Sequence, residues 1–153
     1  MRTVQFIDTS VLLEFLDVPG HNGQHAEITA EMERRIAHNV TFVLPVTTII
    51  ETGNHIAQCS GDRRGAAKRF VRALELARTA EPPWIVRDVA WNGEFLERFV
   101  EGASTGSDLL THLSNKTLGS GDVAILVERE QFKKGIAATV EIWTLDQKLR
   151  SFS

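Results

Sequence analysis

Four acidic side chains stand at positions from which they could act together on one substrate. Asp8 directly follows one short apolar run and Asp146 another, while Glu51 and Asp122 lie in or at the start of predicted helices. If the two apolar runs are parallel strands of one sheet, their carboxyl ends meet at the edge where such sheets bind ligands. We therefore expect the four carboxylates, although distant in sequence, to converge at one edge of a sheet.

A cluster of carboxylates needs something to neutralise it, because like charges repel and burial removes their hydration. No Lys or Arg is adjacent in sequence to Asp8, Glu51 or Asp122, whereas Lys148 lies close to Asp146. Oxygen ligands favour Mg²⁺ or Mn²⁺ over softer metals. Such a cation positions a phosphate and lowers the pKa of bound water. The residues therefore point to phosphodiester hydrolysis by cation-activated water, without a covalent intermediate.

Each acid also has an ordinary structural alternative. Asp122 could be only the N-cap of the helix that follows it, and Asp146 could cap a helix at the end of the chain. Glu51 could be a solvated helix residue. Each signal alone is weak, and it is their combination in one order that favours a site.

The elements that must position these acids alternate between strands and helices. Apolar runs predict strands over residues 3–7, 40–44, 84–89 and 139–145. Helical spacing predicts helices over residues 11–17, 26–38, 46–58, 63–80, 92–100 and 123–135, with short ones near residues 109–113 and after residue 146.

Two further helix starts have a candidate cap: Thr9 or Ser10 for the first, and Asp62 for the fourth. The β-branched residues of the segment 46–58 work against a helix, but its apolar spacing favours one. The alternation predicts a single α/β domain over residues 1–153, with a mostly parallel sheet and right-handed crossovers.

Composition sets limits on the class of protein. The chain has 153 residues, 42% of them hydrophobic, which is enough for one domain with a real core. Its net charge of −3 is unlike that of a general nucleic-acid binder, although a local basic patch could still bind RNA. Cys59 is the single cysteine, so no internal disulfide can form. The N-terminus lacks an apolar signal core, and we expect a cytoplasmic protein without a membrane span.

Four segments together resemble the motifs of PIN domains, in the order that family has them. They are FIDTSVLLEFL (6–16), IIETGNHI (49–56), GSGDVAILVE (119–128) and IWTLDQKL (142–149). Val123 stands where Ala is more usual. The resemblance implies a Rossmann-like three-layer α/β/α fold and a Mg²⁺- or Mn²⁺-dependent ribonuclease. It also implies a role as a VapC-type toxin held by a cognate antitoxin.

The resemblance assigns roles by position. Asp8, Glu51 and Asp122 match the main acidic positions and Asp146 matches a fourth. Ser10 and Thr144 match hydroxyl positions that orient carboxylates or water, although they could equally be ordinary turn and strand-end hydroxyls. The chain is longer than a compact toxin of this type, and the extra length lies in residues 21–25 or 102–118.

Other polar and aromatic residues have less specific roles. Arg64, Lys68 and Arg72 share one helix face and could contact RNA phosphates, or could simply be solvated. His55, four residues after Glu51, could ligate a metal or be an ordinary polar residue. The tryptophans fit core or interface positions better than base-stacking platforms.

Other functions remain as alternatives. A haloacid-dehalogenase-like enzyme needs a second Asp two residues after the first, where this chain has Ser10. A receiver domain needs a lysine at the late strand end, where this chain has Asp146. A catalytically inactive PIN-type binding module would be expected to lack some of the acids, and all four are present. We expect RNA as the substrate and a second copy of the chain as a partner.

Overall fold

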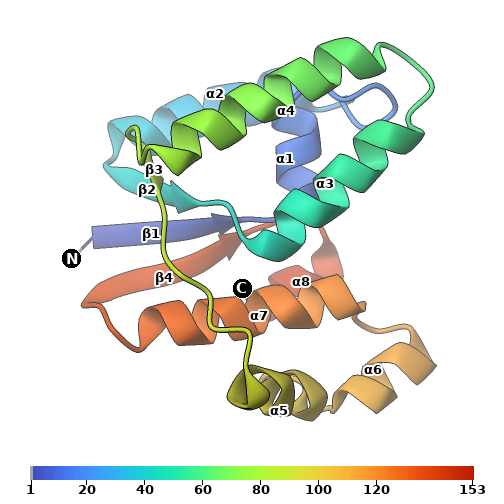
Figure 1. Cartoon of the computed structure of the whole chain (residues 1–153), viewed down its shortest axis with the longest axis vertical. Coiled ribbons are helices and arrows are strands. Elements are labelled where there is room, and N and C mark those ends of the chain that lie inside the picture. Colours follow the sequence, from blue (N-terminus) through green and yellow to red (C-terminus); the bar gives the residue numbers. More distant parts are fainter. Residues whose placement is uncertain (1) are drawn as a thin grey trace.

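The computed structural model describes residues 2–153 and contains a four-stranded sheet at its centre (Figure 1). All neighbouring strands are parallel, and their order across the sheet is β3-β2-β1-β4. The strands are β1 (Arg2–Ile7), β2 (Val40–Val43), β3 (Trp84–Ile85) and β4 (Ala138–Trp143). The predicted parallel sheet is confirmed.

Helices cover both faces of the sheet and make three layers (Figure 1). One face carries α1 (Thr9–Phe15), α2 (His25–Ala37), α3 (Val46–Gln58) and α4 (Arg63–Arg78). The other carries α5 (Gly93–Glu101), α6 (Leu109–Asn115) and α7 (Ser120–Lys133), and α8 (Gln147–Arg150) follows β4. This is the α/β/α architecture expected from the alternation of elements.

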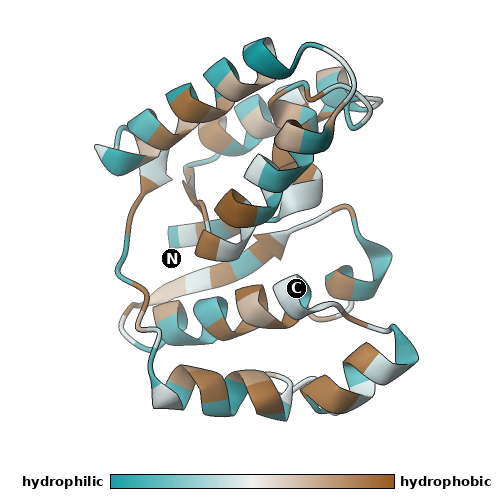
Figure 2. Cartoon of the chain, turned by 45° about the vertical axis from the view of Figure 1, so that its right-hand side comes forward, coloured by the Kyte–Doolittle hydropathy of each residue, from teal (hydrophilic) through white to brown (hydrophobic). Residues whose placement is uncertain are grey.

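Both faces of the sheet are buried, as is usual for parallel strands. In β1, Ile7 packs into the core beneath α1 to α4, whereas Val4 and Phe6 pack into the core beneath α7. Helices α5 and α6 pack on the outer side of α7 and carry hydrophobic bands (Figure 2). Part of these bands is exposed, at Leu96, Val100, Leu110 and Leu113.

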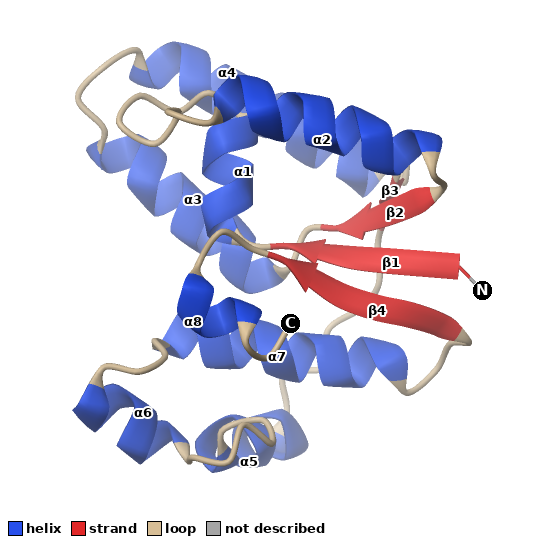
Figure 3. Cartoon of the chain, turned by 180° about the vertical axis from the view of Figure 1, so that it is seen from behind, coloured by secondary structure: helices blue, strands red, loops and turns tan. Residues whose placement is uncertain are grey.

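The strand order creates a topological switch point between β1 and β4. From β1 the chain adds β2 and then β3 on one side, and it returns to place β4 on the other side of β1. Ile7 pairs with Trp143, and the Asp8 N–H donates to the Trp143 carbonyl at 3.0 Å. Figure 3 shows β1, β2 and β4 pointing toward the same edge, near α8. Ligands of open α/β sheets bind at such a point.

The third strand is shorter than the predicted segment 84–89. Its last residue, Ile85, pairs with Val43, which is the last residue of β2. Pro45 then begins the turn into α3, so the residues after Ile85 have no strand to pair with. Val86 is exposed instead.

Two helix starts also differ from the prediction. Thr9 and Ser10 are not caps, because α1 begins at Thr9 and Asp8 stands at the N-cap without a side-chain capping bond. Helix α7 begins at Ser120 rather than after Asp122. By contrast, α3 covers the predicted residues, and Asp62 caps α4 by accepting from the Gly65 N–H at 2.9 Å.

Within residues 2–153, no helix is both long and apolar enough to cross a membrane.

Candidate functional site

Asp8 lies almost buried at the end of β1 and is held by two hydroxyl groups. Ser10 Oγ donates to Asp8 Oδ2 at 2.9 Å, and Thr144 Oγ1 donates to the same oxygen at 2.7 Å. Each hydroxyl also accepts a backbone N–H, from Leu145 and Asp146 respectively. The backbone after β4 therefore fixes both hydroxyls, and they fix the orientation of the Asp8 carboxylate.

Glu51 reaches from α3 toward the first turns of two other helices. Thr9 Oγ1, on α1, donates to Glu51 Oε1 at 3.2 Å. A Cβ atom on Gly121, in the first turn of α7, would lie only 2.5 Å from the same oxygen. The space that holds the Glu51 carboxylate therefore exists because residue 121 has no side chain.

Asp122 and Asp146 each make a local capping bond as well as contributing to the acidic edge. Asp122 Oδ2 accepts the Gly119 N–H at 3.1 Å, which is one half of a capping box. Asp146 Oδ1 accepts the Lys148 N–H at 2.9 Å and caps α8. Asp146 is thus the cap expected in the structural alternative, whereas Asp122 lies inside α7, whose N-cap is Gly119. Each capping bond occupies one carboxylate oxygen.

The four carboxylates influence one another electrostatically. Burial raises the pKa of Asp122 to about 6; the Gly119 N–H opposes this, and the charges of Asp8, Asp146 and Glu51 add to it. Burial also raises the pKa of Glu51. The hydrogen bond from Thr9 opposes this rise, and the charge of Asp8 adds to it. These four residues are called the acidic edge below.

No ion pair described among residues 2–153 includes a member of the acidic edge. Lys148, the cation nearest to it in sequence, donates its Nζ to the Lys116 carbonyl at 3.0 Å. The negative charge is therefore balanced by hydroxyl and backbone N–H groups and not by Lys or Arg.

The donor chemistry of the acidic edge fits a hard cation. Within residues 2–153, no three His, Cys, Asp or Glu side chains lie close enough to form a ready metal centre. Mg²⁺ does not require one, because it keeps several waters and is usually held by one or two carboxylates. The carboxylate oxygens of Asp8, Glu51, Asp122 and Asp146 are the ligand type that such a partly hydrated ion prefers.

The predicted RNA-binding cations lie elsewhere. Arg64, Lys68 and Arg72 are all exposed on α4. Lys68 and Arg72 line an apolar groove beside Phe15, whereas Arg64 lines a separate hollow between α3 and α4. The structure thus divides the three cations between two surfaces. The ring of His55 packs edge-on against His21, with centroids 4.9 Å apart.

The sequence did not identify two residues that position the Glu51 carboxylate. Thr9 was interpreted only as a cap, and Gly121 only as part of a loop. Both act across helices on Glu51, so no local pattern identifies them; the adjacency of Thr9 to Asp8 and the Gly-Ser-Gly segment were the available signals.

The structure thus brings Asp8, Ser10 and Thr144 into direct contact and places Asp8, Glu51 and Asp146 within electrostatic reach of Asp122. The chain matches no protein-family model, no curated protein and no solved structure. A functional conclusion therefore depends on the site itself.

Proposed function

We propose that this chain is a Mg²⁺- or Mn²⁺-dependent ribonuclease of the PIN-domain type, with the acidic edge as its cation site. The observation that carries the proposal is the arrangement of the acids. Burial and the charges of Asp8, Asp146 and Glu51 raise the pKa of Asp122 at a topological switch point, and no ion pair described among residues 2–153 includes any of the four. A fold that keeps such repulsion has a use for a cation there.

Neighbouring hydroxyl groups hold two carboxylates of the acidic edge in place. Ser10 and Thr144 hold Asp8 in one orientation, and Thr9 holds Glu51 in the space beside Gly121. Such preorganisation avoids rearrangement when a charged ligand arrives.

Asp122 and Asp146 complete the set, because each keeps one oxygen outside its capping bond. When bound, the cation would polarise the phosphodiester and lower the pKa of the attacking water. The carboxylates of the acidic edge would hold that ion and orient its waters.

The test is cleavage of a structured RNA by the purified chain, in Mn²⁺ and in EDTA. We expect cleavage only with the metal, and a loss of about 10³-fold in Asp8→Asn because several kcal/mol of charge stabilisation disappear. Glu101→Gln, which removes an acid from an ion pair with Arg98, is the matched control and should cleave normally.

Persistent cleavage in EDTA, or full activity of Asp8→Asn, would sink the metal-dependent mechanism. Binding of RNA with no cleavage in any metal would instead favour the catalytically inactive PIN-type module.

Partners and location remain part of the proposal. We propose a cytoplasmic protein that acts as a toxin, pairs with a cognate antitoxin and forms a homodimer. Expression of the chain alone should then arrest growth, and co-expression of the adjacent reading frame should relieve the arrest. Normal growth under strong induction would count against the toxin role.

A further inference from the structure

A pocket of about 330 Å³ opens beside the acidic edge. It shares Glu51 with that edge, Gly121 also lines it, and its apolar walls come from Ile50, Trp91 and Phe99. Ligand pockets are usually apolar hollows of this size with a few polar groups at one side. We call it the side pocket. Its carboxylate end belongs to the acidic edge, and its apolar part has no role in the chemistry described above.

Trp91, which lines the side pocket, is unusually exposed for a tryptophan. Its ring lies on Phe95, with centroids 4.1 Å apart and planes 31° apart, so it is braced from one side. The residue is nevertheless 53% exposed, while Trp84 and Trp143 are 5% and 6% exposed in the core. Ile50, another residue of the lining, is 60% exposed. Two large apolar side chains therefore face solvent next to the carboxylates.

We propose that the side pocket binds an unpaired nucleobase of the RNA strand whose phosphate lies at the acidic edge. The inference rests on the proposed ribonuclease function and adds a substrate class to it. An aromatic ring stacks on any base, because every base has a π face. A nucleotide combines such a flat apolar surface with a phosphate, which matches a pocket that joins apolar walls to a cation site.

The side pocket selects for strandedness more than for sequence. A base inside a duplex is already stacked and paired, so only a single strand, a loop or a flipped nucleotide can reach Trp91. Thr47, in the pocket lining, already donates its hydroxyl to Glu128 at 3.3 Å. Few polar groups are thus left to read base edges, and we expect weak base preference.

The experiment is a binding titration in which Ca²⁺ replaces Mn²⁺. Ca²⁺ is also a hard cation that oxygen ligands bind. The probes are a short single-stranded oligoribonucleotide and its duplex. Single-stranded RNA should quench the tryptophan fluorescence, because Trp91 is the exposed tryptophan. Trp91→Ala should bind it about tenfold more weakly, the loss of one stacked base. Trp91→Phe should retain most of the affinity but lose the quenching.

Leu110→Ala is the matched control, since Leu110 is an exposed apolar residue of α6 outside the pocket. It should bind like the parent. The proposal is overturned if Trp91→Ala binds as tightly as the parent, or if the duplex binds and quenches as well as the single strand. The proposal is also overturned if neither RNA quenches the fluorescence. A side chain of a partner protein would then be the candidate occupant of the pocket.

A parallel cleavage assay separates this inference from the proposed function. Metal-dependent cleavage with an unaffected Trp91→Ala variant would remove only the base pocket. Quenching and tenfold weaker binding without any cleavage would keep the pocket and remove the nuclease proposal.

Discussion

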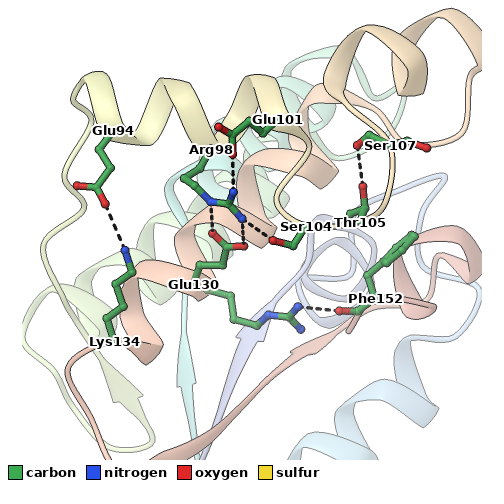
Figure 4. Close-up of polar contacts among 10 residues, drawn as sticks. Glu94, Arg98, Glu101, Ser104, Thr105, Ser107, Glu130, Lys134 and Phe152 are labelled. Atoms are coloured by element: carbon green, nitrogen blue, oxygen red, sulfur yellow. Dashed lines mark hydrogen bonds and ion pairs between the residues drawn. The ribbon is translucent and has the colours of Figure 1, made fainter.

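Two groups of acids in this molecule differ in their partners. In the first, between α5 and α7, every acid drawn has a cation (Figure 4). Arg98 binds Glu130 at 2.9 Å and Glu101 at 2.6 Å, and Lys134 binds Glu94 at 3.2 Å. At the acidic edge, burial and neighbouring carboxylates raise the pKa of Asp122 and Glu51, and the partners described for the four acids are hydroxyl and backbone N–H groups.

The difference separates stability from function. Ion pairs such as those of Arg98 are easily made on a surface and are worth about 0–1 kcal/mol each. The same chain leaves its more buried and mutually repelling acids without such pairs. Because this repulsion costs folding free energy, the unpaired group is the one expected to serve a ligand.

The largest expected effect comes from replacing a carboxylate of the acidic edge by an amide. The same replacement in the ion-paired group serves as the comparison. Asp122→Asn should lower cleavage by about 10²–10³-fold through the loss of cation binding. Without metal it should be more stable at neutral pH. Its raised pKa means that the folded state loses stability as pH rises through about 6, and a neutral amide escapes this loss. We expect about 1–2 kcal/mol, since solvent screens part of the effect.

Glu130→Gln should behave in the opposite way. It breaks the pair with Arg98, so stability should fall by less than about 1 kcal/mol while cleavage is unchanged. Urea unfolding in EDTA and cleavage in Mn²⁺ measure the two quantities. If Asp122→Asn is less stable and fully active, the acidic edge is structural and the comparison fails.

A smaller effect should come from filling the space beside Glu51. In Gly121→Ala the new methyl group displaces the Glu51 carboxylate, which is the movable end of a side chain, so the fold should survive. Alanine also favours a helix over glycine, and stability should not fall. Cleavage should drop about 10–100-fold, as for other residues that orient metal ligands.

Gly93→Ala is the control, because a Cβ atom in this first turn of α5 meets no atom within 4 Å. It should gain similar helix propensity and cleave normally. A Gly121→Ala variant as active as Gly93→Ala would show that the position of Glu51 does not matter.

The sequence predicted the elements better than the contacts between them. Helix α3 was predicted from its apolar spacing with its observed bounds, but its buried residues are Thr48, Thr52 and Ile56, while the apolar Ile50 is exposed. The length of β3 could not be predicted, since it depends on where β2 ends. Periodicity reports the burial of a segment and not the length of its neighbour.

The acidic edge shows the same limit. The positions of Asp8 and Asp146 followed from strand ends and parallel topology. The resemblance indicated that Thr144 orients a carboxylate, and the structure gives Asp8 as its partner. The bond from Thr9 to Glu51 crosses 42 positions, and only the folded chain reveals it. The exposure of Trp91 was also hidden, because the sequence analysis favoured core or interface positions for all the tryptophans.

The smallest expected effect tests whether an acid without a cation always marks a ligand site. Glu128 is buried on α7, and its oxygens accept the N–H groups of Val46 and Thr47 at the start of α3. Burial raises its pKa and these hydrogen bonds oppose the rise. Arg87 and Asp88 line the same cavity. Both Glu128 oxygens are thus committed to a helix terminus, and we expect a structural role.

Because the folded pKa of Glu128 lies above its unfolded value, its stabilising contribution is complete below about pH 4.3 and is lost as pH rises through the folded pKa. Glu128→Gln should flatten this slope in urea unfolding, with a pH-independent offset of about 1 kcal/mol from the lost accepting oxygen. Glu97→Gln, at an exposed position of α5, should keep the parent slope. Cleavage by Glu128→Gln should equal that of the parent, and a loss as large as that of Asp122→Asn would place Glu128 with the acidic edge.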